Sequence, residues 1–95
     1  MFEAFVVDES LFKTKVAFLF SEEAGLVNLA YVKRITIEAN GKSRLVADLG
    51  GEKVLLKTYS SNKSARMATL IIARRIKSGS AIIMVPEEQE VEATG

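Results

Sequence analysis

Apolar and polar residues alternate most regularly in the middle of the chain, where the pattern predicts three consecutive strands. The runs 33–39, 42–49 and 52–59 have the composition and the alternation of strands. Asn40-Gly41 separates the first two runs, and Gly50-Gly51 separates the last two. Asn-Gly is typical of a type I′ turn, in which both central residues need a positive φ. Two tight turns in succession predict an antiparallel meander.

Two-residue turns at both places predict a definite strand register. They pair Ile35 with Val46, Thr36 with Leu45, Val46 with Leu55 and Leu45 with Leu56. One face then carries Ile35, Ile37, Val46 and Leu55, and the other carries Val32, Leu45, Ala47, Val54 and Leu56. Because both faces are apolar, we expect the sheet to be covered on both sides.

The segment 62–77 predicts the principal helix, because it contains no glycine or proline. Oxygen atoms suitable for the N-cap lie in 60–62, and Gly79 stands just beyond the predicted end. At about 100° per residue, one apolar stripe forms along the helix. Its members are Ala65, Ala68, Thr69, Ile72 and Ile76. This stripe predicts the surface that packs on the sheet.

Three further apolar residues of the helix lie outside that stripe: Met67, Leu70 and Ile71. A helix that is apolar nearly all round is usually buried on more than one side. Either other strands of the domain cover these residues, or they form a self-association interface, most simply in a homodimer. The apolar runs 18–20 and 81–85 also favour an interaction module, since a chain of this size can bury only part of its apolar surface.

The two ends of the chain add less regular elements. The runs 2–8 and 15–20 are rich in strand-forming residues, 26–32 fits a short strand plus a turn, and 80–85 fits a final strand. Residues 87–95 are predicted to form a disordered acidic tail. The sequence therefore predicts a single α+β domain over residues 1–86. In it, an antiparallel meander of about five or six strands packs against one long helix.

The composition argues against catalysis. The chain has no histidine, cysteine or tryptophan among its 95 residues. It therefore lacks the most common metal ligands, the usual general base and the thiol nucleophile. The adjacent acids Glu22-Glu23 and Glu87-Glu88 fall in a predicted loop and in the tail, where a desolvated acid–base pair is not expected. We expect no enzymatic activity, no metal and no cofactor.

The same composition bears on location. A chain without cysteine cannot have the disulfide framework of many small secreted domains. The first residues lack the basic start of a signal peptide, and the longest apolar run, Ala81–Val85, is far too short to span a bilayer. We expect a cytoplasmic protein, of bacterial or phage origin, that does not bind membranes.

Charge is distributed unevenly along the chain. The net charge is −3 over residues 1–32, +8 over residues 33–77 and −4 after Pro86. The basic middle is either an ordinary solvated surface or a face that binds nucleic acid. On the predicted helix, four cations lie within roughly a quarter-turn of one another, as in a row that contacts phosphates. These candidate anion-binding residues are Lys63, Arg66, Arg74 and Lys77.

A strand–strand–strand–helix plan covers about half of the chain. It is carried by Val27-Asn28-Leu29, Val32, Ile35-x-Ile37, Val54-x-Leu56 and Tyr59-Ser60-Ser61 leading into Ala65. In this plan the chain resembles small uncharacterised bacterial and phage proteins, and a meander closed by one helix also resembles the pleckstrin-homology-like roll. The resemblance implies a fold and no activity.

These observations lead to one expected function and one alternative. We expect a non-catalytic protein-interaction or assembly module that self-associates as a dimer, with Met67, Leu70 and Ile71 at the interface. The alternative is a nucleic-acid-binding protein that uses the basic face of residues 33–77.

Overall fold

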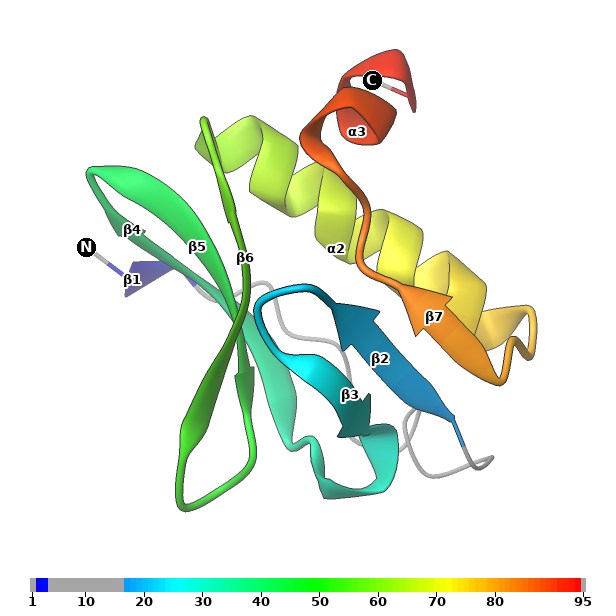
Figure 1. Ribbon diagram of the computed structural model, residues 1–95. Coiled ribbons are helices and arrows are strands. Elements are labelled where there is room, and N and C mark those ends of the chain that lie inside the picture. The colour runs from blue at the N-terminus through cyan, green and yellow to red at the C-terminus, as the bar shows by residue number, and fades with distance from the viewer. Residues whose placement is uncertain (1, 4–16, 95) are drawn as a thin grey trace.

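The computed structural model describes residues 2–3 and 17–94 of the chain (Figure 1). Within these residues the fold is α+β, with two open sheets and one principal helix packed against them. The predicted fold class is therefore confirmed. Most of the strand predicted over 2–8 and the beginning of the strand predicted over 15–20 lie outside the described residues.

The first sheet contains the predicted meander. Its four antiparallel strands have the order β1-β4-β5-β6. They are β1 (Phe2–Glu3), β4 (Arg34–Asn40), β5 (Lys42–Asp48) and β6 (Lys53–Tyr59). The turns between β4, β5 and β6 lie where the glycines predict them, and β1 pairs with the other side of β4.

The second sheet joins segments from the two ends of the described chain. Its strands are β2 (Phe18–Ser21), β3 (Gly25–Asn28) and β7 (Ile82–Met84), in the order β3-β2-β7. Strands β2 and β3 form an antiparallel hairpin, while β7 runs parallel to β2. A one-turn 3-10 helix (Leu29–Tyr31) follows β3, in agreement with the strand plus turn predicted for 26–32. The sequence predicted these elements individually but not their assembly into a separate sheet.

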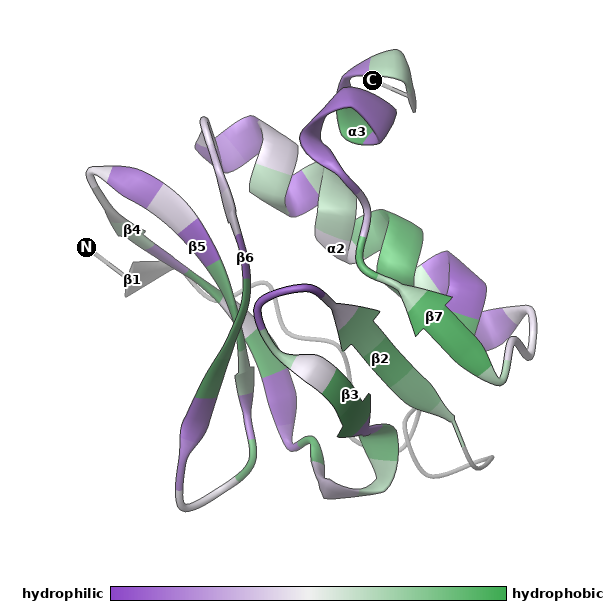
Figure 2. Ribbon diagram, viewed as in Figure 1, coloured by the Kyte–Doolittle hydropathy of each residue, from purple (hydrophilic) through white to green (hydrophobic). Residues whose placement is uncertain are grey.

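The principal helix, α2, extends over Asn62–Lys77, as predicted. Ser61 caps its N-terminus by accepting a hydrogen bond of 3.1 Å from the Ser64 amide, and Gly79 follows the helix with a φ of 91°. The predicted stripe is buried, and the helix contacts β4, β5, β6 and β7. Figure 2 shows apolar stretches of α2 behind β7. One cluster of buried side chains therefore joins both sheets to the helix.

The hairpin between β4 and β5 differs from the prediction by one residue. Ile35 pairs with Ala47 and Thr36 with Val46, so that the predicted Ile35–Val46 pairing is wrong. Gly41 has a φ of 84°, but no non-glycine residue of the described chain has a positive φ. The turn therefore cannot be type I′, which needs two such residues. A slip of one residue moves every side chain of β4 to the opposite face of the sheet.

This slip gathers the apolar residues of the first sheet on one face. The side chains that face the core are Ile35, Ile37, Leu45, Ala47, Leu56 and Tyr59. The opposite face mixes Thr36, Val46 and Leu55 with charged side chains such as those of Arg34, Glu38 and Lys53. The prediction of two apolar faces is therefore wrong for this sheet.

A β-bulge adjusts the second hairpin. The predicted pairing of Val46 with Leu55 is confirmed, but Leu45 then pairs with Lys57 instead of Leu56. The extra residue is Leu56, whose side chain is fully buried. The bulge also places Lys57 on the same face as Leu45 and brings Tyr59 into the core, because it changes the alternation along β6.

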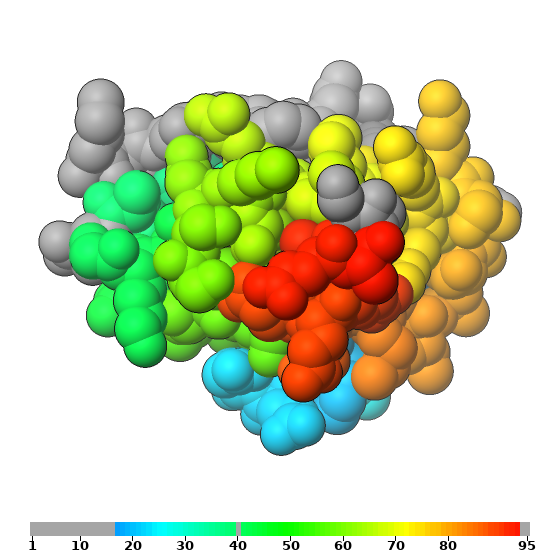
Figure 3. Space-filling view, turned by 90° about the horizontal axis from the view of Figure 1, so that it is seen from above, coloured from blue at the N-terminus to red at the C-terminus, as the bar shows by residue number. Residues whose placement is uncertain are grey.

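The acidic C-terminal segment is not a disordered tail. It forms a short helix, α3 (Glu88–Thr94), and its Val91 side chain is buried in the common core. Figure 3 shows α3 lying against α2. The prediction from composition failed here because one apolar residue among four glutamates anchors the segment, and local charge gives no sign of such an anchor.

Candidate interaction surfaces

The apolar helix residues predicted as an interface do not form one surface. Ile71 is only 7% exposed and belongs to the core. Met67 is half-buried and packs against that core. Leu70 is 37% exposed. Of the two explanations that the sequence left open for Ile71, burial within the chain is the one found.

A different apolar surface lies on the outer side of the second sheet. The strand register places six residues on this side, Asn28 and five apolar residues, and we name the five apolar residues the apolar sheet face. Its members are Phe18, Phe20, Leu26, Ile82 and Met84. The alternate residues Leu19, Val27 and Ile83 point to the other side and are buried in the core. Figure 2 shows hydrophobic residues along most of β2, β3 and β7.

Much of the apolar sheet face is accessible to solvent. Leu26 is 62% exposed, Ile82 is 59% exposed and Met84 is 52% exposed, while the two phenylalanines are half-buried. An antiparallel sheet with one solvated face normally alternates apolar and polar side chains, whereas here both sides are apolar. A contiguous exposed apolar patch on a small protein is typical of an interaction site.

The sequence contained a signal for this surface. The runs 18–20 and 81–85 are apolar without alternation. Such a pattern is typical of strands that are covered on both faces. The sequence does not say that these runs, about sixty residues apart, pair with each other. That pairing creates the face.

The four predicted anion-binding residues share one exposed face of α2. Lys63, Arg66, Arg74 and Lys77 are all exposed, and Leu70 lies among them on the helix surface. We name this row of four cations the basic ridge. The structure thus brings the four side chains to one surface, and their role there stays a prediction.

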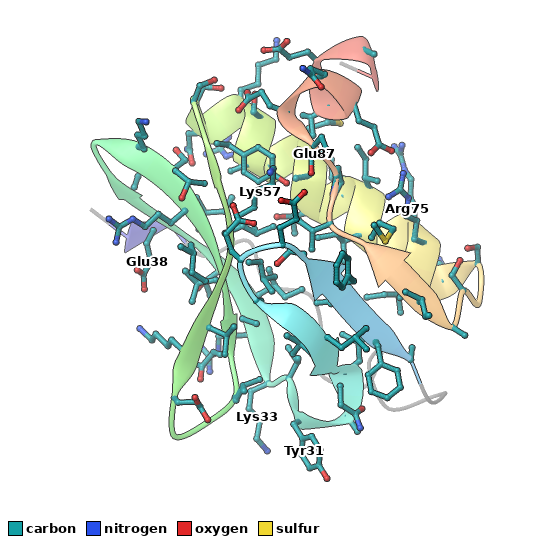
Figure 4. The ribbon with its side chains drawn as sticks, in the orientation of Figure 1. Tyr31, Lys33, Glu38, Lys57, Arg75 and Glu87 are labelled. Atoms are coloured by element: carbon teal, nitrogen blue, oxygen red, sulfur yellow. The ribbon has the colours of Figure 1, made fainter. Side chains whose placement is uncertain are left out.

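The acidic segment after β7 is attached to the body by polar contacts. Lys57 forms an ion pair of 3.2 Å with Glu87, and the Ser60 amide and hydroxyl donate hydrogen bonds of 2.9 and 2.8 Å to Glu88. Figure 4 shows Lys57 and Glu87 side by side near the start of α3. These donors hold the pKa of the Glu88 carboxyl below its usual range, with the Ser60 amide as the main cause.

Arg75 connects α2 to both β7 and α3. Its Nη1 donates a hydrogen bond of 3.0 Å to the Met84 carbonyl, and its Nη2 forms an ion pair with Glu90. Figure 4 shows Arg75 beside β7. The planar fork of the guanidinium presents separate donors to the two elements at once.

Beside α3 lies a small cavity of about 310 Å³, lined by Lys63, Ser64, Met67, Val91 and Glu92. Its walls combine two apolar side chains with charges of both signs. No set of titratable groups in it suggests a reaction. Among the described residues, no group of three acidic side chains gathers closely enough to hold a metal ion.

Comparison with models of protein families, with curated proteins and with solved structures found no match. No helix in the described part of the chain is long and apolar enough to cross a membrane. Two surfaces remain as indications of function, the apolar sheet face and the basic ridge.

Proposed function

We propose that the protein is a non-catalytic assembly module that self-associates through the apolar sheet face. The observation that carries this proposal is the exposure of Leu26, Ile82 and Met84 on one side of a sheet whose other side is already core. Burial of a fully exposed side chain of this kind contributes about 1.5–3 kcal/mol. Covering three half-exposed ones would therefore contribute a few kcal/mol.

A second copy of the chain is the partner that this face fits best. The face has no charged residue on it, so a charged partner would lose solvation there without gaining an ion pair. An identical face avoids this loss, and a two-fold axis makes such a contact self-complementary.

The charges at the two ends of the face support the same partner. Glu22 and Glu23 are exposed in the turn between β2 and β3, at one end. Lys77 is exposed at the end of α2, just before β7 begins at the other end. When two copies stack in opposite directions, the acidic end of each meets the basic end of the other.

The size of the face sets the expected strength. Its three strands span only about 10 Å between the outer strand axes. A standard interface buries roughly 800 Å² on each partner, more than this face alone can supply. We therefore expect a weak, concentration-dependent dimer.

The proposal can be tested by sedimentation of the full chain over a wide concentration range. We expect a monomer–dimer equilibrium that Met84→Lys shifts at least tenfold toward monomer, because a symmetric contact brings the two introduced cations close together. The matched control is Leu55→Lys, which adds the same charge at an exposed leucine of the first sheet.

A wild-type chain that stays monomeric at its highest soluble concentration would overturn the proposal. So would a dimer that Leu55→Lys weakens and Met84→Lys leaves intact. Circular dichroism of both variants would check that each retains its fold.

A further inference from the structure

We infer that the basic ridge of α2 is a second interaction surface, which binds the phosphate backbone of a nucleic-acid duplex. The ridge lies on a different element from the apolar sheet face and shares only Lys77 with the proposed contact between two copies. With 3.6 residues per turn, its four cations fall within a sector of about 80°, and they extend over about 21 Å of the helix axis.

Several cations outside the ridge stand beside acidic groups of the described chain. On the first sheet, Arg34 lies 3.8 Å from Asp48 and Lys53 lies 3.4 Å from Glu38, so these charges are compensated locally. By contrast, Lys63, Arg74 and Lys77 form no ion pair with any acidic group of residues 17–94. The helix itself contains no acidic residue.

The ridge is positively charged, whereas the remainder of the chain carries a net negative charge. The ridge holds four of the thirteen Lys and Arg residues, and the other nine stand against twelve acids, which leaves −3 elsewhere on the chain. A polyanion is therefore attracted to the ridge and repelled by the rest of the surface on average. On the α3 side, Glu92 lines the same cavity as Lys63.

The chemistry of the ridge fits phosphates on a duplex better than other anions. Its cations are held in a row by a helix that is fixed in the core through residues such as Ala68 and Ile72. A B-DNA strand presents one phosphate per about 3.4 Å along the axis, so a row of this length can meet several of them. No aromatic side chain lies on the ridge, so base stacking on single strands is not supported.

A lipid surface fits less well. Helices that bind membranes insert an apolar face between lipid headgroups. The apolar face of α2 is buried in the core, and only Leu70 interrupts the exposed cations.

Contacts to phosphates alone would also carry no sequence preference.

The test is a titration of a labelled mixed-sequence DNA duplex, followed by fluorescence anisotropy at about 50–200 mM salt. Four phosphate contacts predict a slope of about −3.6 in log K against log salt, or about a hundredfold loss of affinity over this range. The double variant Lys63→Gln, Arg74→Gln, which leaves Lys77 and the proposed contact between copies unchanged, should reduce the slope to about −1.8.

A matched control distinguishes a specific effect of the ridge from a general effect of the net charge of the protein. Lys42 and Arg44 are exposed cations on β5, and Lys42→Gln, Arg44→Gln removes the same charge from the first sheet. This control should keep the wild-type slope. An equal loss in both double variants would overturn the inference, as would absence of duplex binding at low salt. Binding to phosphatidylserine vesicles without binding to the duplex would also overturn it, in favour of a lipid surface.

Discussion

Tyr59 links the first sheet to the segment that follows the second one. Its hydroxyl donates a buried hydrogen bond of 2.6 Å to the carbonyl of Pro86, which lies 27 residues further along the chain. Burial raises the pKa of the Tyr59 phenol well above its usual range, and the nearby Glu87 and Glu88 carboxylates raise it further. The neutral, hydrogen-bonding form of this tyrosine is thus the form that the fold selects.

Removal of that hydroxyl should therefore destabilise the protein. We expect Tyr59→Phe to lower the free energy of unfolding by about 1–2 kcal/mol, because the Pro86 carbonyl would stay buried without its donor. Tyr31 provides the control, since its side chain is exposed and Tyr31→Phe should change stability by less than about 0.5 kcal/mol. Urea denaturation measures both, and equal losses in the two variants would contradict the expectation.

At the scale of the element, the turn at Gly41 determines which face of β4 enters the core. Asn40 pairs with Lys42 across this glycine, and the resulting register places Ile35 and Ile37 opposite Ala47 and Leu45. All four side chains are fully buried. With the register predicted from a two-residue turn, the two isoleucines would instead point to the mixed face.

A residue with a side chain at this turn should oppose the observed register. Gly41 has a φ of 84°, a left-handed conformation that costs most other residues about 1–2 kcal/mol. We expect Gly41→Ala to lose about that much stability in thermal or urea unfolding. Gly51→Ala is the matched control, because Gly51 has open space around it and no positive φ. Comparable destabilisation at both glycines would show that the conformation of Gly41 is not the cause.

In the whole molecule, the acidic and basic parts of the chain contact each other. The acidic segment 87–94 lies on the basic part of the chain, where Lys57 and Arg75 form ion pairs with Glu87 and Glu90. Exposed ion pairs contribute little individually, so the buried Val91 is the main apolar anchor of α3. The docked segment leaves the ridge cations Arg74 and Lys77 without acidic partners in the described chain.

The attachment of α3 should weaken in acid. The folded-state pKa of Glu88 lies below its ordinary value of 4.5. Its contribution to stability is therefore complete above pH 4.5 and is lost as the pH falls through the folded-state pKa. We expect NMR signals of Ser60 and Val91 to report this loosening at acidic pH. Glu88→Gln should remove that pH dependence, while Glu92→Gln, on the exposed side of α3, should retain it.

Several elements follow from local signals in the amino-acid sequence. The caps of α2, the turn at Gly50-Gly51 and the pairing of Val46 with Leu55 follow from neighbouring residues, which act over a few bonds. The grouping of Lys63, Arg66, Arg74 and Lys77 on one surface is likewise a direct result of helical periodicity.

Other features depend on residues that are far apart in the chain and come together only in the folded protein. The parallel pairing of β2 with β7 joins segments about sixty residues apart and creates the apolar sheet face. The slip at Gly41 brings Ile35 and Ile37 into the core and the bulge adds Leu56, and the local pattern predicts neither irregularity. The burial of Ile71 and the exposure of Leu70 likewise depend on which sides of α2 the rest of the chain covers. The helix α3 forms where composition alone predicts disorder, because Val91 and its polar contacts gain their stability from surfaces that exist only once the rest of the chain has folded.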